Sequence, residues 1–223
     1  MSNAFFITAT GTDVGKTYVL CRILEQMRGR GQDVFALKPV LSGFDRSTQS
    51  NSDAGRLLAA LGRSVDSKNV ASIAPWRFRE PISPDMAAER EGVLVTLADV
   101  ASFCRNEFSQ QPGTGFVEGA GGILSPLGRD FTNLDLAESL DVPVVLVAGA
   151  YLGTISHTLT ACAALRERRR QPVSIVLCEA QGGPVSLKAT AEAISRFVDT
   201  PIHTVANRGR VPDRLIDQLV STA

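Results

Sequence analysis

The sequence predicts an α/β fold in which helices cover both faces of a parallel β-sheet. Short apolar, β-branched segments alternate with longer segments of helical periodicity, and the most apolar one, PVVLVAG, contains no alternating polar residues. Strands that are covered on both faces have such uninterrupted apolar runs. Strand–helix alternation is typical of β–α–β crossovers, which make the strands parallel. With 223 residues and 44% hydrophobic content, we expect one domain over residues 1–223.

Six segments have strand composition, because each combines apolar residues with β-branched or aromatic ones. In chain order they are AFFITA (4–9), DVFALK (33–38), TGFVE (114–118), PVVLVAG (143–149), VSIVLC (173–178) and PIHTVA (201–206). Apolar residues three or four positions apart predict helices in the segments between them. These helical segments are 16–29, 53–61, 84–91, 96–108, 154–169, 186–198 and 212–221. The stretch LSGFDRSTQSNSD has neither pattern, and irregular stretches of this length are usually functional or mobile.

Composition argues against several functional classes. The formal net charge is zero, so neither nucleic acid nor a membrane surface is an expected partner. The basic run at 166–170 follows a helical pattern, and we interpret it as a solvated last helical turn rather than an RNA-binding patch. No apolar stretch approaches the ~18 residues of a membrane span, and the first residues lack the features of a signal peptide.

The cysteines and histidines predict neither disulfides nor a zinc site. The four cysteines are far apart in the sequence, and neither histidine has a second ligand at metal-binding spacing. Reduced thiols are typical of a cytoplasmic protein, which is the expected location.

The segment TATGTDVGKT predicts a phosphate-binding loop. It lies between the first predicted strand and the first predicted helix, where free backbone N–H groups bind anions. In the pattern G-x-x-x-x-G-K-[ST], Lys16 reaches the outer phosphates and the Thr17 hydroxyl binds Mg²⁺. The position of the first glycine in that pattern is occupied by Thr10. The alternative is a Gly-rich turn without function.

This loop and five other segments resemble the dethiobiotin synthetase family, in the same order and at similar separations, over residues 5 to about 178. The segments are ALKPVLSG, NSDA, REPISPDMAA, VEGAGG and PVVLVAGAYLGTISHTLTA. The family's first loop glycine lies one residue earlier, where this chain has Ala9, and Gly11 stands where aspartate is common. An alanine there is strained only if its φ is positive.

The resemblance implies a P-loop NTPase fold, and ATP and Mg²⁺ as cofactors. It also implies an activity in biotin biosynthesis. One amine of 7,8-diaminopelargonic acid takes up CO₂ as a carbamate, which attacks the γ-phosphate to give a carbamic–phosphoric anhydride. The second amine then closes the ring of dethiobiotin and releases phosphate. This chemistry needs charge neutralisation and precise placement of two amines rather than a protein nucleophile.

The resemblance assigns roles to individual residues. The expected catalytic residues are Lys38, Lys16 and Thr12, and the expected Mg²⁺ ligands are Thr17, Asp53 and Glu118. The expected nucleotide-binding residues are Asp13, Val14, Gly15, Lys16, Thr17, Tyr18, Asp53, Glu118, Gly119, Ala120, Gly121, Cys178 and Glu179. The expected substrate-binding residues are Ser42, Gly121, Gly122, Leu152, Gly153 and Thr154. In the family the last three belong to the partner subunit of a homodimer.

Each assignment has a structural alternative. Lys38 is also compatible with a strand-end lysine whose stem is buried and whose charge is solvated. Thr12 and Ser42 are also typical turn residues. Asp53 could cap a helix, a role that Ser52 could equally fill, and residues 152–154 could cap another.

Four departures from the family lie around the base and the substrate. Asp85 stands where histidine is common, Ser156 replaces an asparagine, and Cys178 and Glu179 replace Asn-Asp. VANRGR (205–210) replaces the usual Ile-Pro or Val-Pro segment. A cysteine lacks the paired donor and acceptor of an amide, so we hypothesise that ATP, CTP and GTP are used alike.

Three other functions compete with this one. An amide-forming enzyme of the cobyrinate amidotransferase kind would need a further glutaminase domain. A ParA/MinD-like switch ATPase normally has a second lysine near position 11, where this chain has glycine. The third is a member of the same family with altered or lost catalysis.

Overall fold

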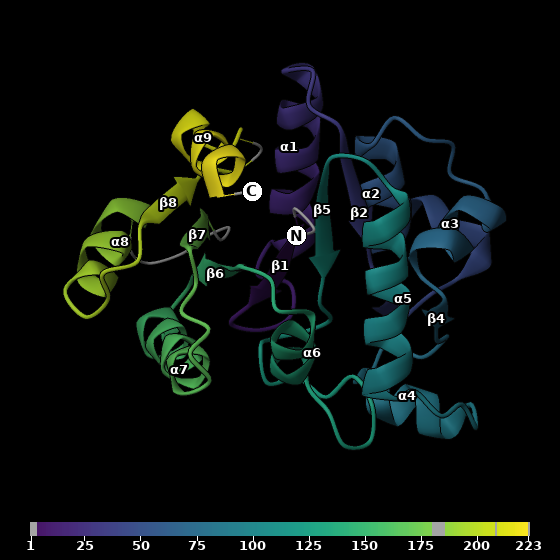
Figure 1. Ribbon diagram of the computed structural model, residues 1–223. Coiled ribbons are helices and arrows are strands. Elements are labelled where there is room, and N and C mark those ends of the chain that lie inside the picture. Colours follow the sequence, from purple (N-terminus) through teal and green to yellow (C-terminus); the bar gives the residue numbers. More distant parts are fainter. Residues whose placement is uncertain (1–3, 180–185, 208, 223) are drawn as a thin grey trace.

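The computed structural model describes residues 4–179, 186–207 and 209–222. A six-stranded, parallel sheet with the strand order β2-β5-β1-β6-β7-β8 forms its centre (Figure 1). The strands are β1 (Ala4–Ala9), β2 (Val34–Leu37), β5 (Thr114–Glu118), β6 (Val144–Ala150), β7 (Ser174–Glu179) and β8 (Ile202–Val205). All six predicted strands are therefore confirmed, as is the parallel arrangement.

Helices cover both faces of the sheet, as predicted. α1 and α9 lie on one face, whereas α6 and α7 lie on the other (Figure 1). The helices that form in predicted segments are α1 (Lys16–Gly29), α2 (Asp53–Ala60), α4 (Pro84–Arg90), α5 (Leu97–Gln110), α7 (Thr154–Glu167), α8 (Leu187–Ser195) and α9 (Asp213–Thr222).

Five short elements were not predicted. They are β3 (Val40–Leu41), the 3₁₀ helix η1 (Arg46–Asn51), α3 (Ser67–Ile73), β4 (Trp76–Arg77) and α6 (Asn133–Leu140). The expectation that LSGFDRSTQSNSD is irregular throughout is wrong, because η1 lies within it. Asp45 caps η1 by accepting a hydrogen bond from the Ser47 N–H at 2.8 Å. The sequences of these five elements lack a clear apolar period, which in elements this short is often absent.

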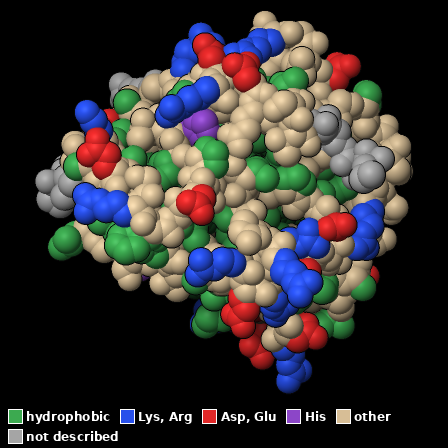
Figure 2. Space-filling view, turned by 60° about the vertical axis from the view of Figure 1, so that its left-hand side comes forward, with side chains coloured by type: hydrophobic (Ala, Val, Ile, Leu, Met, Phe, Trp, Pro, Cys, Tyr) green, Lys and Arg blue, Asp and Glu red, His purple; other side chains and the backbone are tan. Residues whose placement is uncertain are grey.

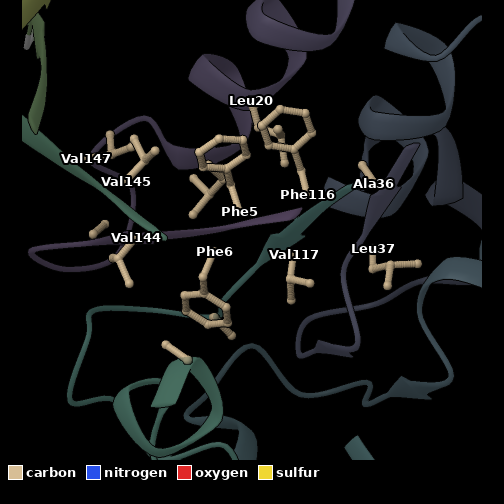
Figure 3. Packing of buried hydrophobic residues seen from close by; sticks show 14 of the residues in the cluster. Phe5, Phe6, Leu20, Ala36, Leu37, Phe116, Val117, Val144, Val145 and Val147 are labelled. Atoms are coloured by element: carbon tan, nitrogen blue, oxygen red, sulfur yellow. The ribbon is translucent and has the colours of Figure 1, made fainter. Parts of the chain in front are cut away.

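The core is built on alternate faces of the central strands (Figure 3). Phe5 and Phe116 point toward Leu20 of α1, and their ring centroids are 5.6 Å apart. Phe6 points the opposite way, toward α6, and every residue of β6 is buried. This packing on both faces explains the uninterrupted apolar run and fixes the carboxyl ends of the strands, where ligands bind in sheets of this type.

The surface charge is mixed. Figure 2 shows acidic and basic side chains interspersed on the face in view. In the basic run, α7 ends at Glu167, and Arg168 forms ion pairs with Glu138 at 2.5 Å and Asp135 at 3.6 Å. The run thus begins in the last turn of α7 and continues past its end; residues 166–169 are exposed, as predicted, and Arg170 is half-buried. None of the helices described has the length and apolar character that crossing a membrane requires.

Candidate active site

The phosphate-binding loop connects β1 to α1 at the carboxyl edge of the sheet. Gly15 is the N-cap of α1 with a φ of +105°, and a Cβ on it would lie 2.9 Å from the Cys178 sulfur. Only glycine fits this position without strain. Ala9 is in β1 and has no positive φ, so the missing family glycine causes no backbone strain. A Cβ on Gly11 would meet nothing within 4 Å.

Lys16 folds back over this loop. Its Nζ donates to the Gly11 carbonyl at 3.3 Å, and only 7% of the residue is exposed. Burial and the nearby charge of Lys38 lower the pKa of Lys16 to about 8. The start of α1 has neither a side-chain cap nor an acidic residue in its first turn. A lysine beside free helix N–H groups forms a site suited to phosphate.

Lys38 lies at the centre of a buried charged cluster. Its Nζ donates to Glu118 Oε1 at 2.8 Å and to the Gly119 carbonyl at 2.7 Å, and it lies 3.2 Å from Asp53 Oδ2. Thr17 Oγ1 donates to the same Glu118 oxygen at 2.8 Å. Lys38 is 2% exposed, so the alternative of a solvated strand-end lysine is wrong.

The charges in this cluster stabilise one another. Burial alone would lower the pKa of Lys38, but the charges of Glu118 and Asp53 outweigh it and raise that pKa. Burial would likewise raise the pKa of Asp53, but Lys38 outweighs it and holds that pKa below its usual value. Lys38 is therefore an ammonium and Asp53 a carboxylate at neutral pH.

The oxygens of this cluster fit a magnesium ion. Glu118 Oε2 is buried without a hydrogen-bond partner, and Thr17 supplies a hydroxyl beside it. Ser52 is the N-cap of α2, because its Oγ accepts from the Gly55 N–H at 3.1 Å. Asp53 is therefore not the cap, and its carboxylate faces Lys38 instead. Two carboxylates and a hydroxyl are hard oxygen donors of the kind that Mg²⁺ prefers.

A cavity of about 180 Å³ lies beside the loop, at the carboxyl ends of β7 and β8. Its lining comprises Asp13, Val14, Gly15, Tyr18, Gly149, Tyr151, Cys178, Glu179, Val205, Ala206 and Asn207. Burial raises the pKa of Cys178 to about 12, so this thiol stays protonated. Glu179 Oε2 accepts from the Asn207 N–H at 2.8 Å, which joins the two strand ends. The structure thus brings together six residues that the sequence assigned to the nucleotide.

A second cavity, of about 510 Å³, lies on the other side of the loop. Its lining comprises Thr12, Asp13, Ser42, Gly43, Pro81, Ile82, Ser83, Pro84, Ala120, Gly121 and Ser125. Asp13, whose φ is +57°, lines both cavities. Thr12 and Ser42, for which a simple turn role was the alternative, therefore face a common cavity with Gly121.

Three predicted substrate residues lie elsewhere in this chain. Leu152, Gly153 and Thr154 line a groove between α7 and α8 and do not share a cavity with Ser42. Gly122 lines a third cavity, of about 460 Å³, with Thr10 and Gly11. Gly153 is the N-cap of α7, so the capping alternative describes its local geometry.

Sequence reasoning missed Asn133, a fully buried residue whose side chain contacts the loop after β5. The only sequence signal was a polar residue among apolar ones just after a Phe-Thr pair, which also fits an ordinary helix start.

Comparison with known proteins identifies the family. A family model described as "AAA domain" matches residues 3–213. The chain is 44% identical over 221 residues to the ATP-dependent dethiobiotin synthetase BioD of Caulobacter sp. (strain K31), covering 98% of this chain and 94% of that protein. The chain belongs to the dethiobiotin synthetase family. A second family member, from Acidiphilium cryptum, is 45% identical over 195 residues, which is 87% of each chain.

Solved structures confirm the P-loop NTPase type of fold of this dethiobiotin synthetase family member. A chain of the MinC:MinD cell division protein complex of Aquifex aeolicus gives a TM-score of 0.56 at 12% identity, covering 98% of this chain and 86% of that one. A ParA family ATPase from Chlorobium tepidum gives 0.53 at 15% identity, covering 98% and 88%. At such low sequence identity, the similarity to these structures concerns the fold alone.

Proposed function

We propose that this protein forms dethiobiotin from 7,8-diaminopelargonic acid and CO₂ with ATP and Mg²⁺, in biotin biosynthesis. The observation that carries the proposal is the charged cluster of buried Lys38 and Glu118 with half-buried Asp53, next to the phosphate-binding loop. Family membership supports the same reaction, because the relatives are named ATP-dependent dethiobiotin synthetases. We also propose that residues 1–223 act as one synthetase domain in the cytoplasm.

In this reaction, each of the polar and charged groups around the γ-phosphate has a specific role. Lys16 and Lys38 neutralise the transferring phosphoryl group and the carbamate oxygen that attacks it. Thr12 donates a hydrogen bond to these oxygens. Thr17, Asp53 and Glu118 hold Mg²⁺, which supplies charge neutralisation on the phosphates when bound. No residue forms a covalent bond with the substrate, so catalysis rests on placement and electrostatics.

The nucleotide and the diamine occupy the two cavities that meet at Asp13. The 180 Å³ cavity takes the base, next to Cys178 and Glu179, and the 510 Å³ cavity takes the diamine against Ser42 and Gly121. The α7 start at Leu152, Gly153 and Thr154 lies apart from that cavity within one chain. We propose that it binds the carboxylate of a diamine held by the partner in a homodimer, through N–H groups of the first turn other than that of Thr154, which donates to the Tyr151 carbonyl at 3.1 Å.

The proposal is tested with purified protein, the diamine, bicarbonate and MgATP, with mass spectrometry of the products. We expect dethiobiotin and one phosphate for each ring closed. Lys38→Ala should abolish product formation while ATP binding stays measurable by calorimetry. ATP hydrolysis that does not depend on the diamine would instead indicate a switch ATPase or altered catalysis. Comparison of ATP, CTP and GTP tests the expected loose base discrimination, which a strong preference for ATP would contradict.

A further inference from the structure

Asn133, the first residue of α6, forms side-chain hydrogen bonds with the glycine-rich loop after β5, residues 119–125. Its Oδ1 accepts from the Ala120 N–H at 3.2 Å, and its Nδ2 donates to the carbonyls of Ala120 at 2.6 Å and Gly122 at 2.8 Å. Its backbone N–H donates to the Ser125 carbonyl at 3.2 Å. Asn133 is 0% exposed, and both ends of its amide are used.

The helix does not need this side chain as a cap. Thr132 is the N-cap of α6 and forms a capping box with Asp135, in which each side chain accepts a backbone hydrogen bond of the other residue. The Asn133 side-chain amide therefore forms its hydrogen bonds with the loop and is not needed to cap the helix. A Cβ on Gly119 would lie 2.3 Å from Asn133 Oδ1, so the amide and the loop backbone are packed in direct contact.

The loop that Asn133 fixes carries groups of the proposed active site. The Gly119 carbonyl accepts from Lys38 Nζ, and Gly121 lines the cavity proposed for the diamine. The Gly122 N–H donates to Ser125 Oγ at 2.8 Å. Within the described chain, the Gly121 N–H has no protein acceptor, and its φ is +71°. This N–H is therefore available to a ligand, as is that of Leu124 in the same loop.

We propose that Asn133 is a positioning residue for the reaction: its amide holds the loop so that Lys38 and the Gly121 N–H meet the carbamate oxygens of the diamine correctly. This inference rests on the proposed function. The cavity assigned to the base of the nucleotide is lined by other segments, among them residues 13–15, 178–179 and 205–207, so the loop does not contact the base. Loss of the amide should therefore impair the diamine step and spare ATP binding.

Steady-state kinetics of Asn133→Ala test this role. We expect the KM for the diamine to rise and kcat to fall by up to about 100-fold, as for a small misplacement of reacting groups. The Kd of ATP should stay close to the wild-type value. Asn133→Ser keeps a donor and an acceptor, so it should retain more activity than the alanine variant. If the alanine variant does not fold, the serine variant carries the comparison.

The matched control is Leu136→Ala, which removes a buried side chain of the same helix without touching the loop's hydrogen bonds. It should lower stability but leave the KM for the diamine unchanged. Equal kinetic effects in Leu136→Ala and Asn133→Ala would overturn the positioning role, and so would wild-type kinetics in both Asn133 variants.

Hydrogen exchange without any substrate separates this inference from the proposed function. In the Asn133 variants, amides of residues 119–125 should exchange faster, whereas those of α1 should not change. Unchanged exchange in 119–125 would overturn the inference even if the enzyme is active. A wild-type protein that makes no dethiobiotin would instead overturn the proposed function, and the positioning role with it.

Discussion

Replacing Lys38 by methionine removes the cation from an ion pair that is almost completely buried. The side chain of Lys38 is 2% exposed and that of Glu118 is 0% exposed, at an Nζ–Oε1 distance of 2.8 Å. A variant that leaves one buried charge unpaired loses about 3–5 kcal/mol of the free energy of unfolding. The side chain of Asp53 is 36% exposed, so water screens it and we expect it to add little.

Urea unfolding, followed by the fluorescence of the single tryptophan, Trp76, measures this loss. The control is the double variant Lys38→Met/Glu118→Gln, in which no carboxylate is left unpaired at Glu118. We expect it to recover most of the lost free energy, because removing both charges is far less costly than removing one. A loss below about 1 kcal/mol in the single variant, the value typical of exposed pairs, would refute the reasoning. So would a double variant as unstable as the single one.

Three further predictions concern the phosphate-binding loop and the C-terminal part of the sheet. Burial lowers the pKa of Lys16 to about 8, so the free protein loses the positive charge of Lys16 above pH 8. Calorimetry should therefore show the affinity for ATP falling above pH 8 in the wild-type protein but not in Lys16→Met. Gly15→Ala should weaken ATP binding, because the φ of Gly15 is +105° and a Cβ there would lie 2.9 Å from the Cys178 sulfur. The control Gly11→Ala should bind ATP normally, because a Cβ on Gly11 would meet nothing within 4 Å. Burial lowers the pKa of His203 below 6.5, so the unfolded chain takes up a proton first as the pH falls. Stability should drop below about pH 6.5 in urea titrations, and His203→Gln should remove that component.

The sequence was sufficient for the six strands of the central sheet. AFFITA and PVVLVAG correspond to β1 and β6. Every residue in those two strands is buried, so an apolar composition was enough to identify them. The resemblance to the dethiobiotin synthetase family assigned Lys38, Asp53 and Glu118 to one site, and the structure brings them together, with Lys38 Nζ 3.2 Å from Asp53 Oδ2 and 2.8 Å from Glu118 Oε1. Lys38 and Glu118 end predicted strands, and the carboxyl ends of parallel strands meet at one edge.

Long-range contacts explain what the sequence left open. Ser52 and Asp53 were equal candidates for the cap of α2, and their roles are separated by the hydrogen bond from the Gly55 N–H to Ser52 and by the contact of Asp53 with Lys38. Asn133 was missed because a single asparagine at a helix start has no pattern. The side-chain contacts of Asn133 form only because a loop 11 to 13 residues earlier in the chain folds back over it. The role proposed for residues 152–154 involves a second chain, which one sequence does not describe.

Transfer of labelled oxygen from bicarbonate tests the central claim most directly. Purified protein is mixed with the diamine and MgATP in unlabelled water, ¹⁸O-bicarbonate is added, and the phosphate is analysed early by mass spectrometry. If the carbamate oxygen attacks the γ-phosphate, ring closure breaks the carbon–oxygen bond and phosphate leaves with one labelled oxygen while dethiobiotin forms. Unlabelled phosphate, released at the same rate with and without the diamine, would show that water attacks instead and would contradict the account.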